Sequence, residues 1–429
     1  MAKDDNLIFN PYTLPCGLTI QNRLVKTAMT EGLSIDGQVN NRLINLYEQW
    51  SDGGAGVIIS GNVMIDRRYL ERPGNVIIDN NSDRKKLSQW AKAGQKNGNR
   101  FLLQISHPGR QCTKWVNRQP LAPSEVGLEL LRSFAKPRAL SITEIEQIIE
   151  RYARSAQIAE ESGFDGVQIH AAHGYLISQF LSPLTNHRND EWGGSFENRL
   201  RFLLSVIDAV RTNVSPTFAV ALKLNSSDFQ KGGYSIDDCL EVIKVLNDYP
   251  LDFIELSGGT YEQPQLLGHH GDMHDADLPK RDSTIAREAY FVNYAKQVRE
   301  VAKKPLMVTG GFQTVDAIKA ALNHVDFVGI ARPFCVMPDW PNKVKHNDLR
   351  ELPRPESNLL GKGLLGPTSP IQFIQGVNIQ GEVAWFYYQI IRLSDKKNVK
   401  WKKSLLGAFL FHVLREQWLA LKRRKNLQK

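Results

Sequence analysis

The chain has 429 residues, of which 42% are hydrophobic and 23% charged, a composition typical of a globular protein with a large core. Its net charge of +9 comes from the C-terminal end. From Arg392 onward the chain has 12 Lys or Arg and two acidic residues, a net charge of +10. The overall charge therefore says little about what the rest of the chain binds. The sequence shows no apolar run of signal-peptide or membrane-spanning type. Its four cysteines are too few and too scattered for a disulfide framework, a Cys-x-x-Cys metal site or an iron–sulfur cluster. This use of cysteine favours a reducing, cytoplasmic compartment.

The first predicted element is a short β-hairpin over residues 7–20, where Pro11, Pro15 and Gly17 interrupt a weak alternation of apolar residues. Strand-like runs then alternate with segments of helical periodicity. Eight such runs are predicted, at residues 24–26, 56–60, 101–105, 166–169, 218–224, 253–256, 306–309 and 327–330.

The segments between the runs have the caps of helices. Asp83 and Ser141 are expected to begin two of them, and Gly53, Gly98 and Gly163 stand where helices should end. Strands that alternate with helices pair in parallel, and eight such units predict a closed (β/α)8 TIM barrel. The alternative is an open doubly wound sheet, which the lack of a G-x-G-x-x-G turn in the first loop makes less favourable.

The chain after the barrel has a different pattern. We expect a barrel over residues 1–350, and a linker with a basic helical extension over 351–429, with helices at 384–393 and 404–425. The last helix has Leu405, Leu406, Phe409, Val413 and Trp418 near one face and ends in a basic cluster at 422–425. Such a helix either lies on a membrane surface or a partner, or packs its apolar face on the barrel.

Two long loops, at residues 106–140 and 257–285, follow the third and sixth predicted strands, where barrel loops usually shape the substrate site. The second loop contains a conspicuous cluster, which comprises His269, His270, Asp272, His274 and Asp275. A polar lid is the favoured interpretation of this cluster, with metal binding as the alternative.

The stretch 164–184 is the centre of the predicted site. A buried strand there runs into His170, His173 and Tyr175. Two imidazoles three residues apart could hold one carbonyl or nitro oxygen, and a tyrosine beside them could donate a proton to the neighbouring carbon. The alternatives are core packing and His-x-x-His metal chelation, and the latter lacks an obvious third ligand.

Other strand ends carry groups that suit flavin mononucleotide (FMN). Small residues and an arginine after the last two strands form the usual phosphate site of a barrel, an amide at the third strand suits the pyrimidine edge of the ring, and a lysine at the fifth suits the N1/O2 side. The predicted cofactor-binding residues are Ala28, Met29, Thr30, Gln104, Lys223, Gly310, Gly311, Ala331 and Arg332. The alternatives are an ordinary ion pair at the barrel mouth for Lys223 and a plain turn hydroxyl for Thr30.

Over residues 7–345 the chain resembles the old yellow enzymes, the NADH:flavin oxidoreductases. The resemblance rests on NRLVKTAMT (22–30), LLQISHPGRQ (102–111), LKLNSSDF (222–229), VTGGF (308–312), GIARP (329–333) and, most specifically, the segment 163–204. It implies an FMN-containing barrel that reduces the C=C bond of α,β-unsaturated carbonyl compounds with NADH or NADPH. Carried onto this sequence, it implies that His170 and His173 hold the activating oxygen, that Tyr175 donates the proton, and that the cofactor-binding residues named above contact FMN.

The chain departs from the family pattern in two places near the cofactor. Lys223 and Ala28 stand where many relatives carry arginine and proline, and lysine keeps the charge but loses the planar fork. The leading hypothesis is an ene-reductase that works by a ping-pong mechanism. The alternatives are an NAD(P)H:quinone reductase, or a flavoprotein that docks on a membrane or partner through its basic tail. The expected partner is a small enone-type molecule, with no nucleic acid, and a second copy of the chain is a further candidate.

Overall fold

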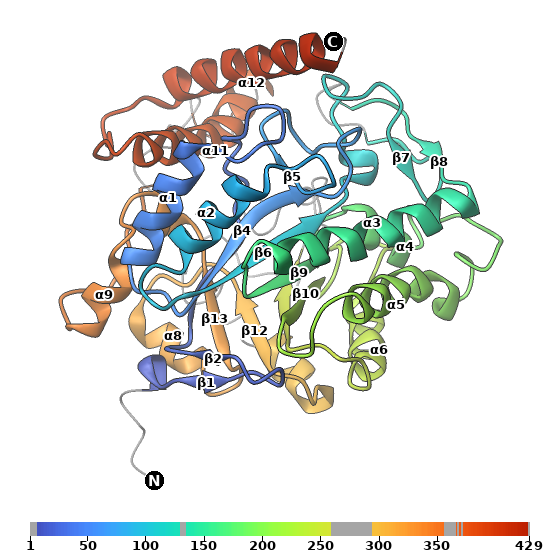
Figure 1. Ribbon diagram of the computed structural model, residues 1–429, viewed down its shortest axis with the longest axis horizontal. Helices are drawn as coiled ribbons and strands as arrows, with labels where there is room; N and C mark the ends of the chain where they lie inside the picture. The colour runs from blue at the N-terminus through green and yellow to red at the C-terminus, as the bar shows by residue number, and fades with distance from the viewer. Residues whose placement is uncertain are drawn as a thin grey trace.

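A computed structural model describes residues 7–128, 134–258, 294–355 and 372–427, together with Gly366 and Ser369. Its centre is a closed barrel of parallel strands (Figure 1). The barrel strands are β3 (Leu24–Lys26), β4 (Val57–Met64), β6 (Arg100–Ser106), β9 (Gly166–Ala171), β10 (Ala219–Asn225), β11 (Phe253–Ser257), β12 (Leu306–Thr309) and β13 (Phe327–Ile330). Each pairs in parallel with the next, and β13 pairs with β3 to close the ring. The predicted (β/α)8 barrel is confirmed.

The helices surround the barrel because each has one apolar face that packs on the outside of the strands. They are α1 (Asn41–Asp52), α2 (Arg84–Gly94), α3 (Ile142–Glu161), α4 (Leu176–Leu181), α5 (Phe196–Thr212), α6 (Ile236–Leu246), α8 (Val315–Ala321) and α9 (Trp340–Lys345). The predicted helix starts are confirmed, as are the helix ends at Gly53 and next to Gly163, but Gly98 does not end a helix, because α2 stops at Gly94. Ser141 and Glu144 form a reciprocal capping box, and the Asp83 side chain accepts a hydrogen bond from the Lys86 N–H at 3.0 Å.

The amino-terminal end of the barrel is closed by a small hairpin, as predicted. β1 (Tyr12–Thr13) pairs antiparallel with β2 (Thr19–Ile20), and Gly17 in the turn has a φ of 87°, which favours glycine. Leu14 and Ile20 pack against the innermost residues of the strands, among them Phe253 and Phe327. The active end must therefore be the opposite one, where the strands finish.

The loop over 106–140 contains the short η2 (Gly109–Gln111) and a two-residue pairing between β7 (Leu121–Ala122) and β8 (Arg138–Ala139). The loop over 257–285 lies outside the described residues from position 259, and with it lies the His269–Asp275 cluster. The glycines and prolines of the predicted linker lie mostly outside the described residues as well.

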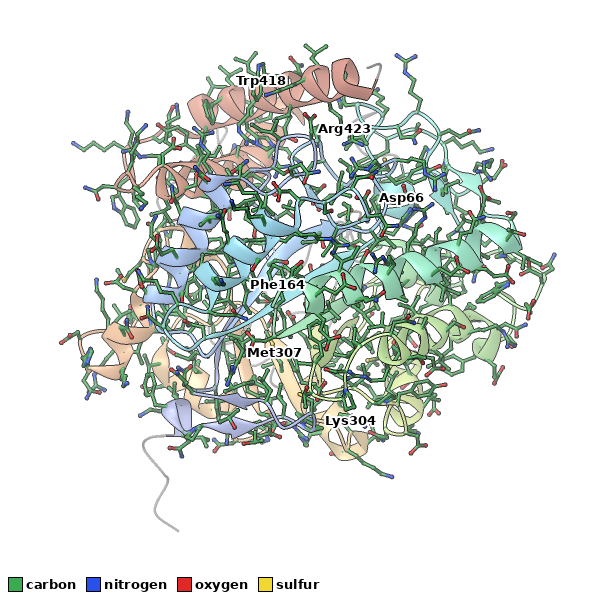
Figure 2. The ribbon with its side chains drawn as sticks, viewed as in Figure 1. Asp66, Phe164, Lys304, Met307, Trp418 and Arg423 are labelled. Carbon is green, nitrogen blue, oxygen red and sulfur yellow. The ribbon has the colours of Figure 1, made fainter. Side chains whose placement is uncertain are left out.

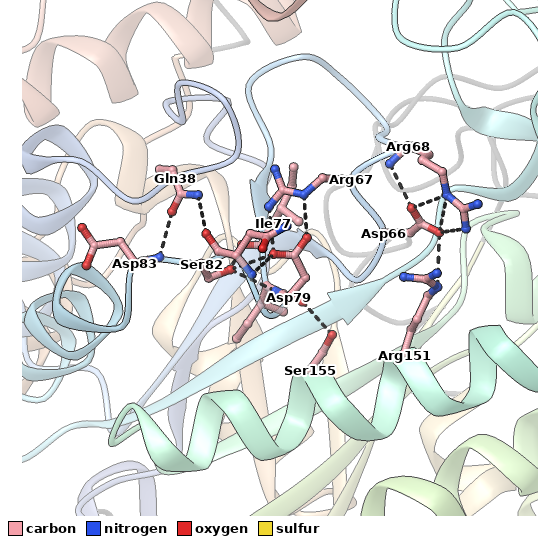
Figure 3. A network of polar contacts seen from close by, with 12 residues as sticks. Gln38, Asp66, Arg67, Arg68, Ile77, Asp79, Ser82, Asp83, Arg151 and Ser155 are labelled. Carbon is pink, nitrogen blue, oxygen red and sulfur yellow. Dashed lines mark hydrogen bonds and ion pairs between the residues drawn. The ribbon is translucent and has the colours of Figure 1, made fainter. Parts of the chain in front are cut away.

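The segment between β4 and α2 is pinned by charged contacts, which Figure 3 shows. Asp66 accepts hydrogen bonds from Arg68 and lies 3.5 Å from the Arg151 guanidinium of α3. Arg67 forms a bidentate pair with Asp79 at 2.7 and 2.8 Å. The segment includes β5 (Val76–Ile77), which adds to the edge of β4. Arg67 and Arg72 of this segment contact Arg423 and Glu416 of the C-terminal extension.

The extension consists of α11 (Gln372–Ser394) and α12 (Leu405–Leu427), which pack together at the end of the molecule opposite β1 and β2 (Figure 1). The helical extension is confirmed, but α11 begins 12 residues earlier than the predicted 384. Gly376 and Gly381 lie in this first part, and glycine lowers the helical propensity that a sequence reading depends on.

Acidic residues join the extension to the barrel. After residue 356 the chain contains only three acidic residues, and each is ion-paired with an arginine of the barrel. The pairs are Glu382 with Arg332 (3.2 Å), Asp395 with Arg42 (2.6 Å) and Glu416 with Arg72 (2.6 Å). The docking is therefore specified by charge as well as by apolar packing.

Candidate active site at the carboxyl ends of the strands

A cavity of about 250 Å³ opens where the barrel strands end. Eight of the predicted site residues line it, and they come from five different strand ends. They are Ala28 and Met29 after β3, His173 after β9, Lys223 on β10, Gly310 and Gly311 after β12, and Ala331 and Arg332 after β13. Residues up to 304 positions apart in the sequence thus meet at one site, as the barrel topology requires.

Four predicted site residues are placed differently. The Thr30 hydroxyl donates to the Glu71 carboxylate at 3.0 Å, and the Gln104 amide is buried and donates to Gln168 Oε1 at 2.7 Å. His170 and Tyr175 are buried directly behind His173. The assignments of all twelve residues to cofactor or substrate remain predictions; the structure shows only that eight of them line one cavity.

Lys223 is held by a carboxylate that sequence reasoning missed. Its Nζ lies 2.8 Å from Glu255 Oε1 on the neighbouring strand β11, and both side chains are buried. Glu255 also accepts hydrogen bonds from the hydroxyls of Thr27 (2.8 Å) and Thr309 (2.6 Å). Burial alone would raise the pKa of Glu255, but the Lys223 ammonium and these donors outweigh it and lower that pKa. Glu255 is therefore ionised at neutral pH.

The same carboxylate connects the lysine to Gln104. Gln168 Nε2 donates to Glu255 Oε2 at 2.7 Å, and Gln168 Oε1 accepts from Gln104. One buried network thus runs beneath the cavity from Gln104 through Gln168 and Glu255 to Lys223. Each end of the network is one of the groups predicted to meet a flavin.

The two histidines contact each other. His170 Nε2 lies 3.3 Å from His173 Nδ1, His170 Nδ1 lies 2.9 Å from Asn62 Oδ1, and His173 Nε2 lies 2.8 Å from the Ser257 hydroxyl. All four ring nitrogens therefore have protein contacts. An oxygen that binds both imidazoles must replace the contact between them.

His173 has a backbone conformation that few non-glycine residues adopt, with φ of 60°. Two side chains hold it there. Asn225 Oδ1 accepts from the His173 N–H at 3.0 Å, and Gln111 Nε2 donates to the His173 carbonyl at 2.8 Å. Gly174 continues the turn with φ of 75°, so that the chain leaves β9 sharply and begins α4. This turn places the imidazole at the cavity wall.

Both histidines are neutral at physiological pH. Burial lowers the pKa of His170 well below 6.5, and the charges of His173 and Lys223 add to this effect. Burial and then the Lys223 charge lower the pKa of His173 in the same way. Neutral imidazoles each carry one N–H, so they can donate to an oxygen without titrating.

Tyr175 is the N-cap residue of α4 and is 3% exposed. Its ring packs on the His170 ring, with 4.5 Å between the centroids. The tyrosine and the two imidazoles thus form one contiguous group at the end of β9, and Lys223 stands opposite His170 on the neighbouring strand β10.

The residues that sequence reasoning missed are buried partners of the predicted ones: Glu255, Gln168, Asn62 and Ser257. Two of them did leave a signal. Gln168 and Glu255 are polar residues inside otherwise apolar strands, where an amide or a carboxylate is costly unless it has a partner.

Comparison with known proteins identifies the family. Residues 7–351 match the profile of the NADH:flavin oxidoreductase / NADH oxidase family. The chain belongs to this family. The NADH-dependent flavin oxidoreductase of Hypocrea jecorina is 39% identical over 361 residues, which cover 79% of this chain and 88% of that protein. The NADH oxidase of Thermoanaerobacter brockii is 32% identical over 342 residues, which cover 78% of this chain and 50% of that protein.

Solved structures support the same membership. Morphinone reductase superposes with a TM-score of 0.68 at 25% identity, covering 87% of this chain and 96% of that one. The old yellow enzyme homologue from Zymomonas mobilis gives 0.68 at 26% identity, covering 85% and 99%. The predicted relationship to old yellow enzymes is confirmed, as are FMN with NADH or NADPH as reductant and a flavin oxidoreductase activity.

The charges of the cavity fit FMN. Arg332 and the side-chain-free backbone of Gly310 and Gly311 offer donors for a phosphate, and Lys223 offers a fixed cation for the ring. Ala28 and Met29 leave an apolar wall on which a ring can rest. The family match ends at residue 351, so the extension lies outside it.

Proposed function

We propose that the protein reduces activated C=C bonds, those of α,β-unsaturated carbonyl or nitro compounds, with NADH or NADPH as the electron source. The observation that carries this proposal is that His170 contacts both His173 and Tyr175, with His173 at the wall of the cavity that Lys223 and Arg332 also line.

Arg332, Gly310, Gly311 and Lys223 would hold FMN, which would supply the hydride for the β-carbon of the acceptor, with NAD(P)H as the source of the electrons. Two neutral imidazoles suit the activating oxygen, because their N–H groups stabilise the negative charge that develops on it as hydride adds. The oxygen takes the place of the contact between His170 and His173. Tyr175 then donates its phenolic proton to the α-carbon, which completes the saturated product.

Lys223 has the supporting role. Its ammonium favours negative charge on the N1/O2 side of the ring, and Glu255 keeps that ammonium in place. Gln104 is fixed through Gln168 to the same carboxylate, so a single network sets the positions of both groups.

The test replaces Tyr175 with phenylalanine. Turnover of a cyclic enone should fall by about 10²–10⁴-fold, the usual contribution of a general acid, while oxidation of NAD(P)H by oxygen persists. Tyr249→Phe is the matched control, because Tyr249 follows α6 on the outside of the barrel and lines no part of the cavity. Equal loss of both activities in Tyr175→Phe would contradict the assigned role, and a protein that stays colourless after reconstitution with FMN would contradict the whole proposal.

The substrate class is tested separately. Cyclic enones, nitroalkenes and quinones are compared with NADH and with NADPH as reductant. Turnover of enones or nitroalkenes that depends on Tyr175 supports the ene-reductase, whereas turnover of quinones alone would favour the quinone reductase, because reduction of a quinone needs no proton on carbon.

A further inference from the structure

Four polar side chains of the last helix, α12, face the inside of the protein. Its Glu416 carboxylate pairs with Arg72 at 2.6 Å, its Arg415 guanidinium donates to the Gly32 carbonyl at 2.6 Å, and Arg423 donates to the Arg67 carbonyl. His412 stacks on Tyr387 of α11 with 5.1 Å between the ring centroids. These contacts fix which side of α12 faces the protein.

The opposite side of α12 is apolar and faces outward. The outer face consists of Leu406, Leu410, Phe411, Leu414, Trp418 and Leu421, which are between 37% and 66% exposed. Leu406, Leu410 and Leu414 follow at steps of four residues, so they form a continuous row along the helix. In Figure 2, Trp418 lies on the outer edge of the molecule and Arg423 lies on the inner side of the same helix.

The sequence prediction for this helix was wrong in one respect. Leu405, Leu406, Phe409, Val413 and Trp418 do not share one face. Leu405, Phe409 and Val413 are partly buried against the rest of the protein, whereas Leu406 and Trp418 are 50% and 54% exposed. The helix has two apolar stripes, and the barrel covers only one of them.

The outer face cannot be buried by turning the helix. Such a rotation would break the Glu416–Arg72 pair and leave Arg72, whose side chain is 8% exposed, without its carboxylate. A buried charge without its partner is strongly unfavourable, because neither water nor a counter charge stabilises it. An exposed row of leucines of this kind marks a surface that binds something else.

The surroundings of the outer face indicate what binds there. Lys400, Trp401 and Lys402 lie at its beginning, and Trp418 and Lys422 lie at its end, with Lys422 Nζ 5.3 Å from the Trp418 ring. The acidic residues of the extension are all held by barrel arginines, so none of them offsets these lysines toward the outside. Tryptophan and lysine at the edges of an apolar helix face suit the boundary between lipid headgroups and acyl chains.

We propose that the outer face of α12 docks on the surface of a membrane that contains anionic phospholipid. The leucines and Trp418 enter the boundary between headgroups and acyl chains, and the lysines contact the phosphates. The helix lies in the plane of the surface. Among the described residues no helix is long and apolar enough to cross a membrane, so the contact is peripheral.

A membrane fits better than a second copy of this chain. In a symmetric pair the same surface faces itself, so the lysines at the ends of the two helices would be brought near one another. An anionic lipid surface instead complements them, with about 1 kcal/mol of attraction for each lysine near the surface.

The test uses full-length protein loaded with FMN and flotation with vesicles of phosphatidylcholine, with and without phosphatidylglycerol. Wild type should float with the anionic vesicles, and high salt should weaken the binding. Leu410→Ser/Leu414→Ser should reduce the bound fraction by about tenfold or more, because each leucine loses roughly 1.5–3 kcal/mol of burial at most. Leu406→Ser/Leu421→Ser is an independent second variant, and Lys400→Gln/Lys402→Gln should lower the preference for anionic vesicles.

Ile142→Ser is the matched control, since Ile142 is a similarly exposed apolar residue, 42% exposed, at the start of α3. It should float like wild type. Retained flavin absorbance and an unchanged melting temperature show that the leucine variants are folded. The proposal is overturned if wild type does not float, or if both leucine variants float like wild type. It is also overturned if light scattering shows a wild-type dimer that these variants convert to a monomer without any vesicle binding, because the face then belongs to a second copy.

Discussion

Glu255 and Lys223 form an ion pair at the floor of the cavity, 2.8 Å apart, with both side chains buried on adjacent strands. A buried pair of this kind is costly to break from one side only, because the remaining charge has neither water nor a partner. The pair therefore has consequences for stability as well as for the cofactor.

We expect Glu255→Gln to destabilise the protein by about 3–5 kcal/mol, because it leaves the Lys223 ammonium buried without a counter charge. The double variant Lys223→Met/Glu255→Gln should lose clearly less than the sum of the two single variants. Urea denaturation of the three variants gives the coupling free energy. Strictly additive losses would show that the pair does not interact.

The same Glu255→Gln variant should raise the midpoint potential of the bound flavin. Without the carboxylate, the Lys223 charge acts on the ring undiminished and favours the anionic reduced form. A spectroelectrochemical titration against wild type measures the shift, and an unchanged or lower potential would contradict the role assigned to Lys223.

Gly61→Ala should weaken flavin binding although Gly61 does not line the cavity. A Cβ at this position would lie 2.3 Å from the Met29 carbonyl and 2.6 Å from the Thr30 Cα, so the loop after β3 that carries Ala28 and Met29 must move. Overpacking of this kind costs about 1–3 kcal/mol. Gly127→Ala is the control, because a Cβ there meets nothing within 4 Å. The test measures the dissociation constant for FMN in each variant, and equal values for both variants would refute the prediction.

The two active-site histidines predict a flat pH profile. Because burial holds their pKa values well below 6.5, both are neutral around neutral pH, and enone reduction should show no titration of either histidine near pH 6.5, where a free histidine titrates. The effect of these histidines on the pH dependence of stability has the opposite sign to that of an exposed histidine that gains an acidic partner. Below pH 6.5 both histidines are protonated in the unfolded chain but stay neutral in the folded protein. The free energy of unfolding therefore decreases as the pH falls. An inflection near pH 6.5 in kcat/KM that disappears in His173→Asn would contradict this.

The docking of the extension should depend on pH through Glu416. Burial raises the pKa of this carboxyl, but Arg72 outweighs burial and the pKa is lowered from 4.5. Glu416→Gln should therefore cost about 1–3 kcal/mol at neutral pH. The difference in stability from wild type should be full above pH 4.5 and shrink as the pH falls through the lowered pKa, because a protonated glutamate resembles glutamine.

Calorimetry between pH 3 and 7 measures this difference in stability. Asp339→Asn, which removes one charge of an exposed pair with Lys343, is the control that should change little. A difference that is constant with pH would show that the charge of Glu416 is not what matters.

The barrel could be predicted from the sequence because its signal is local. A buried parallel strand is a short apolar run between turns, and 24–26, 306–309 and 327–330 coincide with the observed β3, β12 and β13. The end of β4 was missed, since the strand continues through Ser60, Gly61 and Asn62, where polar residues and a register shift resemble a turn.

Site residues could be predicted where a functional side chain lies at the end of a strand. They could not be predicted where their position depends on hydrogen-bond or ion-pair partners from distant parts of the sequence. Lys223 and Arg332 could be assigned to the cavity because barrel topology brings strand ends together. Nothing local indicates that Asn62 lies against His170, 108 residues away, or that Glu255 pairs with Lys223. The same limit applies to α12. Its sequence shows that leucines are abundant, but only the contacts of Arg415 and Glu416 show which leucines face outward.

The pairing of Arg332 with Glu382 connects the extension to the cavity. Arg332 lines the cavity and also pairs with Glu382 of α11, so an anion that binds this guanidinium would compete or cooperate with Glu382 for it. By thermodynamic linkage, occupancy of the cavity must then alter the free energy of docking of α11, and a change in that docking must alter the affinity of the cavity by the same factor. An event at the outer surface of α12, which packs on α11, can in this way be transmitted to the flavin.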